Sequence, residues 1–169
     1  MKPSKHRRKA SWRDGGLAAT RYERANPGVR KSSREEDMHM HIDYWHDDQG
    51  VDVKGNNLPD EIWVEFKNVN GDHGWLFGEA VSIAFDMPEL AAFVVVDRVE
   101  LKDYCKENVD FTALVTKSEA YKKCYQRKDR EDLITYLVLE DLKNLPSYTV
   151  VGYCTTYIHP ETNKVCSVF

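Results

Sequence analysis

The sequence predicts an α/β domain whose central mixed sheet has about five strands and is flanked by helices. Three observations carry this prediction. Segments of strand length follow one another from His41 to Asp97, helical spacing flanks them, and turn-forming clusters of Asp, Asn and Gly separate them. At 169 residues, 41% of them hydrophobic, the chain is long enough for one core and short for two.

The N-terminal part is expected to be a basic arm followed by two short helices. Residues 1–14 have no hydrophobic period and are predicted to form a flexible arm, with residues 15–169 as the single folded domain. The Gly-Gly pair after the arm opens a helix in LAATRYERAN, which an Asn-Pro-Gly turn ends. Ser32 or Ser33 is expected to cap a second helix beginning at REEDM, whose acids suit a helix N-terminus.

Strands and helices then alternate to the C-terminus. Strands are expected in HIDYWH, GVDVKG, IWVEFK, VSIAFDM and AAFVVVD, and a helix in VELKDYCKENV follows them. DLITYLVLEDLKNLP is predicted to be a strand entering a helix. The β-branched and aromatic residues of 146–169, on both sides of HPETNK, predict a terminal hairpin.

Charge is unevenly distributed along the chain. Residues 1–34 carry eleven Lys or Arg against two acids, and the net charge of −4 leaves the remainder near −13. A basic arm beside an acidic body predicts contact with a polyanion, although a solvated tail is the plainer alternative. The residues expected to bind nucleic acid are Lys5, Arg7, Arg8, Lys9, Arg13, Arg21, Arg24 and Lys67.

Several other classes of protein are excluded by pattern. No apolar run reaches about 18 residues, so no membrane contact is expected. The N-terminus lacks the apolar stretch of a secretory signal, and the four scattered cysteines form no CxxC pair, so reduced thiols and a cytoplasmic location are expected. No glycine-rich phosphate loop or nucleophile elbow is present.

The candidate chemistry lies on the first strands. Because side chains alternate faces, Asp52 and Lys54 of GVDVKG point the same way. Folding the hairpin about the Asp-Asp turn sets Asp43 directly opposite Asp52. Folding the next hairpin about the turn at 57–60 is expected to bring Glu65 beside Asp52, and a one-residue slip would break either alignment.

Such a cluster of carboxylates predicts a divalent metal ion. Like charges raise one another's pKa unless a cation intervenes, and Mg²⁺ or Mn²⁺ prefers oxygen ligands. A metal of this kind activates water for attack on a phosphate. Lys54 would orient or deprotonate that water, or neutralise the charge that develops on the phosphate.

Asp43, followed by Asp52-Val53-Lys54, resembles the motif of the PD-(D/E)XK nuclease superfamily, which includes restriction endonucleases and Holliday-junction resolvases. The stretch from VDVKG to WLFG is also similar to small phage-encoded members that lack an assigned role. The resemblance implies a restriction endonuclease-like fold and metal-dependent hydrolysis of phosphodiester bonds, with DNA favoured over RNA. It further implies a homodimer, as in members that cut both strands, and action in the host cytoplasm if the protein is phage-encoded.

The resemblance also assigns roles to residues. Metal ligands would be Asp43, Asp52, the Val53 carbonyl and a helix acid, Glu36 (or, less favoured, Glu23). Lys54 and Glu65 would complete the catalytic group.

Alternatives remain at several positions. Glu65-Phe66-Lys67 forms a second possible signature, so the catalytic lysine is either Lys54 or Lys67. The motif residues Asp52 and Lys54 could also be a solvent-facing pair on an amphipathic strand. Trp75 either packs in the core or stacks on an unpaired base.

Two rival interpretations concern the whole protein. The sequence HMHID resembles the start of the metallo-β-lactamase zinc motif, but Tyr44 replaces its next histidine. The rival function is a non-catalytic phage protein that keeps a nuclease-like fold and binds nucleic acid or another protein.

Overall fold

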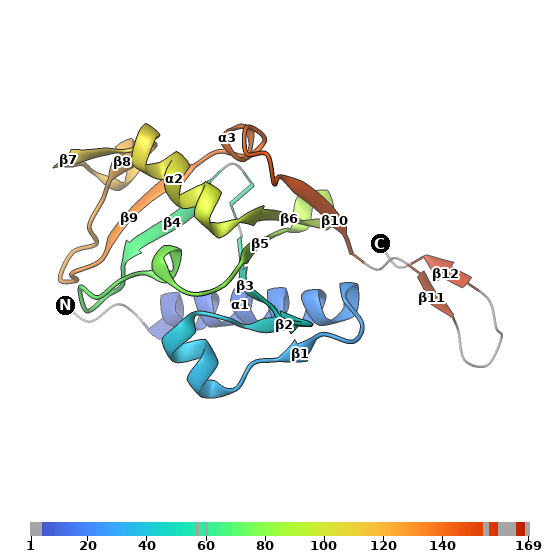
Figure 1. The fold of residues 1–169 in the computed structure, drawn as a ribbon. Helices are drawn as coiled ribbons and strands as arrows, with labels where there is room; N and C mark the ends of the chain where they lie inside the picture. Colours follow the sequence, from blue (N-terminus) through green and yellow to red (C-terminus); the bar gives the residue numbers. More distant parts are fainter. Residues whose placement is uncertain (1–4, 57, 60, 154–155, 159–164, 168–169) are drawn as a thin grey trace.

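The computed structural model describes the backbone of residues 5–56, 58–59, 61–153, 156–158 and 165–167, and within these ranges the side chains of 15–153. Its centre is a sheet of six strands in the order β1-β2-β3-β5-β6-β10 (Figure 1). These strands are β1 (Arg30–Lys31), β2 (Tyr44–His46), β3 (Gln49–Lys54), β5 (Ser82–Met87), β6 (Ala92–Asp97) and β10 (Thr149–Gly152). β3 and β5 are parallel, whereas the other neighbours are antiparallel. The predicted α/β class with a mixed sheet is confirmed, with six strands rather than about five.

Different parts of the chain cover the two faces of this sheet. On one face packs α1 (Lys5–Ala25), whose Tyr22 joins Tyr44, Val51 and Phe93 in a small core. The other face carries the larger core, in which Ile83 and Phe85 of β5 take part. The elements that contribute to this larger core are β4 (Ile62–Lys67), β9 (Leu133–Leu137), α2 (Arg98–Asn108) and α3 (Leu139–Leu142) (Figure 1).

The remaining elements are short. They are the single turns η1 (Glu36–Met40), η2 (Trp75–Phe77), η3 (Pro88–Leu90) and η4 (Lys117–Glu119), and the strands β7 (Asp110–Leu114), β8 (Lys123–Cys124), β11 (Thr156–Ile158) and β12 (Val165–Ser167). None of the helices described by the structure is both long enough and apolar enough to cross a membrane.

The first helix begins earlier than the sequence pattern predicts. α1 starts at Lys5 and passes through Gly15 and Gly16, so the expected start at the glycine pair is wrong, and residues 5–14 are helical backbone. Lys, Arg and Ala favour helix without any apolar period, which is why hydrophobic spacing missed this part. Each glycine costs about 1 kcal/mol relative to Ala, and burial of Ala18 and Tyr22 on the sheet offsets that cost.

Two strand pairings also differ from expectation. β4 does not pair with β3; it pairs with β9 in a separate two-stranded sheet, while β5 takes the place beside β3. The chain therefore leaves the central sheet after Lys54 and returns to it at Ser82. At the C-terminus, β10 belongs to the central sheet, and the terminal hairpin is formed by β11 and β12 alone. The expected HPETNK turn lies outside the described residues.

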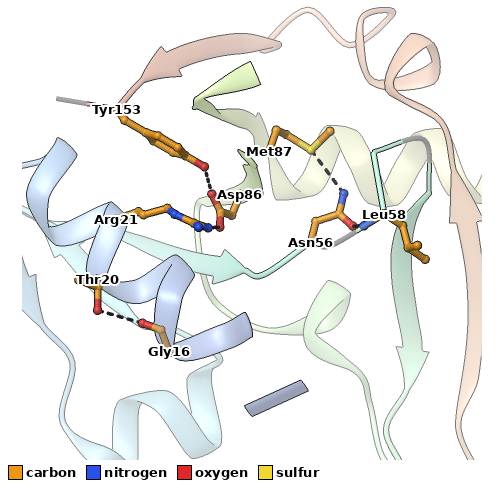
Figure 2. A network of polar contacts seen from close by, with 8 residues as sticks. All are labelled: Gly16, Thr20, Arg21, Asn56, Leu58, Asp86, Met87 and Tyr153. Carbon is orange, nitrogen blue, oxygen red and sulfur yellow. Dashed lines mark hydrogen bonds and ion pairs between the residues drawn. The ribbon is translucent and has the colours of Figure 1, made fainter. Parts of the chain in front are cut away.

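A buried carboxylate fastens α1 to the sheet. Asp86 of β5 is 1% exposed and accepts hydrogen bonds from Arg21 of α1, at 2.6 Å, and from the Tyr153 hydroxyl just after β10 (Figure 2). The Arg21 guanidinium also lies 5.7 Å from the centre of the Tyr153 ring. One side chain thus holds together the N-terminal helix, a central strand and the end of β10.

Replacing Asp86 with Ala should lower the free energy of unfolding by about 2–3 kcal/mol. Removing one partner of a buried ion pair typically costs about 3–5 kcal/mol. A smaller loss of about 2–3 kcal/mol is expected here because the Arg21 side chain is 34% exposed and can reach water after its partner is removed. Urea unfolding followed by circular dichroism measures the loss. Asp103→Ala is the control, because its pair with Lys106 is exposed on α2 and should contribute little to stability. Equal losses in the two variants would contradict the role given to Asp86.

Candidate active site

The site is built on the β2–β3 hairpin, whose two strands are joined by Asp47 and Asp48. Asp47 adopts a left-handed conformation (φ 51°), which Asp tolerates better than most residues. The pairs Tyr44 with Val51 and His46 with Gln49 are those of the predicted register. Continuing that register places Asp43, just before β2, opposite Asp52. The expected register is confirmed for the three pairs of β2 with β3, whereas Asp43 lies just beyond this ladder and donates its N–H to the Val51 carbonyl.

Asp43 ends the β2–β3 ladder with its own side chain. Its N–H donates to the Val51 carbonyl at 2.9 Å, and its Oδ2 accepts the Val53 N–H at 2.7 Å. The Asp43 carbonyl in turn accepts the Ser32 N–H at 2.9 Å. These bonds fix the carboxylate at the open end of the hairpin, beside the Val53 peptide.

Asp52 is a buried carboxylate on the face of β3 that looks toward the larger core. Only 2% of the residue is exposed, its Oδ1 lies 2.7 Å from Lys54 Nζ, and its buried Oδ2 has no hydrogen-bond partner among the described groups. Burial raises the pKa of Asp52 to about 7; the charge of Lys54 and its hydrogen bond oppose this rise, whereas the charge of Asp43 adds to it. A hydrogen bond to Asp43 also favours the protonated form of Asp52, so the Oδ2 atom lacks a partner when both carboxylates are ionised. An unpartnered buried oxygen of this kind requires an explanation, and a role in binding a cation is one.

Lys54 remains protonated beside these acids. Burial disfavours its charge, but the charges of Asp52, Asp43 and Glu65 outweigh that effect, so the pKa of Lys54 is raised. Its Nζ also lies 5.2 Å from the centre of the Trp75 ring, a favourable cation–π position. A raised pKa suits a group that donates hydrogen bonds or stabilises negative charge, and it disfavours the role of general base.

Glu65 reaches the site from the second sheet, not from a strand beside β3, so the predicted hairpin route is wrong. The half-buried carboxylate has a raised pKa because of burial, which the charges of Lys54 and Arg127 partly oppose. The turn η2 packs closely here, since a Cβ on Gly74 would lie 2.4 Å from the Glu65 carbonyl oxygen. Trp75 of this turn is only 7% exposed and belongs to the larger core. Of its two predicted roles, packing in the core is therefore the one that the structure supports.

Glu36 does not serve the site as predicted. Its carboxylate accepts two hydrogen bonds from Arg30, at 2.9 and 3.1 Å, and one from the Ser33 N–H at 2.7 Å. The hydrogen bond from Arg30, the first of these influences, lowers the pKa of Glu36 to about 2. Ser33 Oγ accepts the Glu36 N–H in return, so the expected cap at the start of this helix is confirmed. The alternative acid, Glu23, instead accepts a hydrogen bond from the Tyr44 hydroxyl.

Sequence reasoning missed two neighbours of Asp43. Asp37, next to Glu36, lines a cavity of about 320 Å³ together with Asp43, Lys31 and Ser32. His41 has a lowered pKa, first because of burial and then because of the Lys54 charge, while Asp37 and Asp43 oppose the shift. The signal for Asp37 was present in REEDM, since adjacent residues of a helical turn point in different directions.

The other predicted residues have varied surroundings. Lys67 is exposed at the end of β4, so Lys54 is the lysine that contacts Asp52. Arg24 is exposed, whereas Arg21 is occupied by Asp86, and its predicted role in nucleic-acid binding is not supported. The side chains of Lys5, Arg7, Arg8, Lys9 and Arg13 lie outside the described ones, although their backbone belongs to α1.

The described part of the site offers only a small number of protein groups that could bind a metal ion. In the part of the chain that the structure describes, no three His, Cys, Asp or Glu side chains are arranged to hold a metal ion. The three acids therefore do not form a complete cage, and the described residues do not assemble the zinc site that the rival resemblance of HMHID would require. Asp43, the unpartnered Asp52 Oδ2 and the adjacent Val53 carbonyl still fit Mg²⁺, which proteins often bind through one or two carboxylates.

Comparisons with protein-family profiles, curated proteins and solved structures found no match to this chain. Its function must therefore be argued from the geometry of the site.

Replacing Asp52 with Asn should change how stability depends on pH. The folded pKa of about 7 exceeds the unfolded value of about 3.9, so the folded protein keeps a proton that the unfolded chain loses in this window. Wild-type stability contributed by Asp52 is thus present below about pH 4 and lost as the pH rises through about 7. The side chain of the Asp52→Asn variant cannot ionise. As the pH rises through this window, the free energy of unfolding of the variant should therefore increase relative to that of the wild type by on the order of 2 kcal/mol.

Urea unfolding in EDTA at about pH 4.5, 6 and 8 measures this difference. Asp103→Asn is the control, because Asp103 is exposed and its pKa is lowered by the hydrogen bond from Lys106. Its difference from wild type should stay flat over the same range. A flat difference for Asp52→Asn as well would show that the buried carboxylate does not titrate near neutrality.

Proposed function

We propose that this protein is a metal-dependent nuclease that hydrolyses phosphodiester bonds, with DNA as the favoured substrate. The observation that carries the proposal is the buried Asp52, whose Oδ2 has no partner among the described groups and whose neighbours are Asp43 and Lys54. Two acids opposite each other on an antiparallel hairpin, with a lysine two residues after the second, form the pattern of the PD-(D/E)XK motif. A restriction endonuclease-like fold belongs to the same proposal.

The residues divide the chemistry between them. Asp43, Asp52 and the Val53 carbonyl would hold Mg²⁺ or Mn²⁺ at the open end of the β2–β3 hairpin. When bound, such an ion lowers the pKa of water and neutralises charge on the phosphate. Asp43 is already oriented for this by the Val53 N–H, which leaves its second oxygen for a ligand.

Lys54 supplies positive charge where the phosphate becomes more negative. Its ammonium is held by Asp52 and by the Trp75 ring, so it does not have to be reorganised during the reaction. Its side chain is 28% exposed, which lets a substrate oxygen approach it. Glu65 sets the charge balance around Lys54 from the other side and helps to keep the amine protonated.

Cleavage should require the divalent ion and both motif residues. Duplex, single-stranded, branched and RNA substrates would be incubated with Mg²⁺, Mn²⁺ or EDTA and analysed on denaturing gels. Asp52→Asn and Lys54→Ala should each lower the rate by about 10²–10³-fold, the usual cost of losing one catalytic electrostatic group. Lys106→Ala is the matched control, because Lys106 is exposed on α2 and has no part in the site, and it should cleave close to the wild-type rate. Lys67→Ala is included to test the second signature.

Two results would contradict this assignment. If Lys67→Ala lost activity and Lys54→Ala kept it, the second signature on β4 would be the correct one. If the folded protein cut none of the substrates and bound no Mg²⁺ by calorimetry, the chain would be a non-catalytic binder.

The basic residues of α1 should contribute to binding through counterion release. Changing Arg7, Arg8 and Lys9 together to Gln keeps helix propensity and removes three charges. For each phosphate that the variant no longer neutralises, the slope of log affinity against log salt concentration should become shallower by about 0.9 on duplex DNA. Fluorescence anisotropy of a labelled duplex at several salt concentrations gives this slope.

A control removes the same charge elsewhere. Changing Lys102, Lys106 and Lys143 to Gln alters α2 and the residue after α3, on the opposite side of the central sheet from α1. Its salt slope should stay at the wild-type value. If the slope became equally shallow in both triple variants, binding would depend on net charge and not on α1.

A further inference from the structure

A cavity adjoins the candidate metal ligands. It measures about 320 Å³ and lies between α1, the chain just after β1 and the open end of the β2–β3 hairpin. Asp43, one of the groups assigned to the metal, lines the cavity, and so does Val53, which packs with the small core on the α1 face of β3. Asp52 and Lys54 point to the opposite face, so Asp43 at the end of the hairpin is the link between the two, and a phosphate held there would have one of its attached nucleosides at the mouth of this cavity.

The lining indicates what kind of group the cavity accepts. Among the described residues that line it, two carboxylates, Asp37 and Asp43, face a single cation, Lys31, so a free anion would not be favoured. Ser32 adds a hydroxyl whose buried Oγ has no hydrogen-bond partner among the described groups. The carboxylates and the hydroxyl are acceptors suited to the N–H groups of a nucleobase.

The rest of the wall is small or apolar. Gly15 and Ala19 of α1 form one side, and Val53 with Tyr44 forms another. A Cβ added to Gly15 would meet nothing within 4 Å, so the glycine leaves open space at this edge. A flat, largely apolar ring with polar edges matches such a wall.

The size of the cavity limits the substrate. A volume of about 320 Å³ is at the lower end of the range for ligand sites, which suits one nucleoside and excludes a stacked base pair. A base inside a duplex would first have to leave its stack and its partner, and an unpaired base avoids that cost.

We propose that this cavity receives the base of an unpaired nucleotide next to the cleaved bond, so that the preferred substrate is single-stranded at the cut. The proposal rests on the nuclease function above and adds the substrate class. Ser32 and Asp37 accept hydrogen bonds from the base, while Val53 and Tyr44 pack against its ring.

Filling the cavity from Gly15 tests this assignment. Gly15→Leu places a side chain at the cavity edge, whereas Gly16→Leu adds the same side chain to the same helix at a position that does not line the cavity. A Cβ at either position meets nothing within 4 Å, and Leu favours helix more than Gly does, so both variants should fold. Thermal unfolding followed by circular dichroism checks this first.

Two readouts then separate the possibilities. The probes are a single strand containing 2-aminopurine and a blunt duplex of the same sequence, each with Mg²⁺. Wild type and Gly16→Leu should cut the single strand at least tenfold faster than the duplex and should change the 2-aminopurine fluorescence on binding. Gly15→Leu should lose the fluorescence change and at least tenfold of the single-strand rate.

The failures of the two proposals look different. If wild type cut no probe with any metal, the nuclease function itself would be wrong. If wild type cut with Mg²⁺ but preferred the duplex, or if Gly15→Leu matched Gly16→Leu in rate and fluorescence, the nuclease function would stand and the base-binding cavity would be overturned.

Discussion

The tight turn at Asp47 and Asp48 is the constraint on which the rest of the site depends. It fixes the register of β2 against β3, and this register brings Asp43, just before β2, close to the Asp52 side chain at the end of the ladder. Because side chains alternate along a strand, a slip of one residue would turn Val53 toward the larger core and Asp52 toward α1. Asp52 projects from the face of β3 that the larger core covers, beside the buried Ile83 of β5. The position of Asp52 in the register thus leads to its burial, and burial leads to its raised pKa.

Of the buried carboxylates in the described part of the chain, Asp52 is the one with an oxygen that has no hydrogen-bond partner, and it departs most clearly from what stability alone would select. An apolar side chain at this position would match Ile83, its neighbour on β5, which is fully buried. The chain instead keeps a carboxylate there and offsets part of the cost with Lys54, which in turn is held by the Trp75 ring. Such local conflicts with the rules of core packing are expected at functional sites. The conflict supports a role in chemistry more directly than the motif does, because a short motif also occurs by chance.

Local pattern was sufficient for much of the fold and for the centre of the site. The Asp-Asp turn and the alternation of GVDVKG predict the hairpin, its register and the shared face of Asp52 and Lys54. The departure of β4 to a second sheet was not predictable, because pairing with β9 depends on residues about 70 positions away. For the same reason the partner of Arg21 could not be seen, since Asp86 is 65 residues further along. Asp37 was missed in favour of Glu36 because local spacing does not show which acid a neighbouring arginine takes up.

The contact among Arg21, Asp86 and Tyr153 joins segments that a ribosome delivers at very different times. α1 emerges first, yet the carboxylate that pairs with Arg21 follows 65 residues later, and the hydroxyl of Tyr153 comes 67 residues after that. Tyr22 of α1 can pack on Tyr44 of the β2–β3 hairpin as soon as that hairpin forms, but the ion pair between Arg21 and Asp86 has to wait for β5. The hydroxyl that completes the fastening of the helix is thus synthesised long after the helix itself. A nascent chain halted before β10 would hold α1 without its contact to Tyr153, so the helix would be less firmly attached to the sheet than in the complete fold.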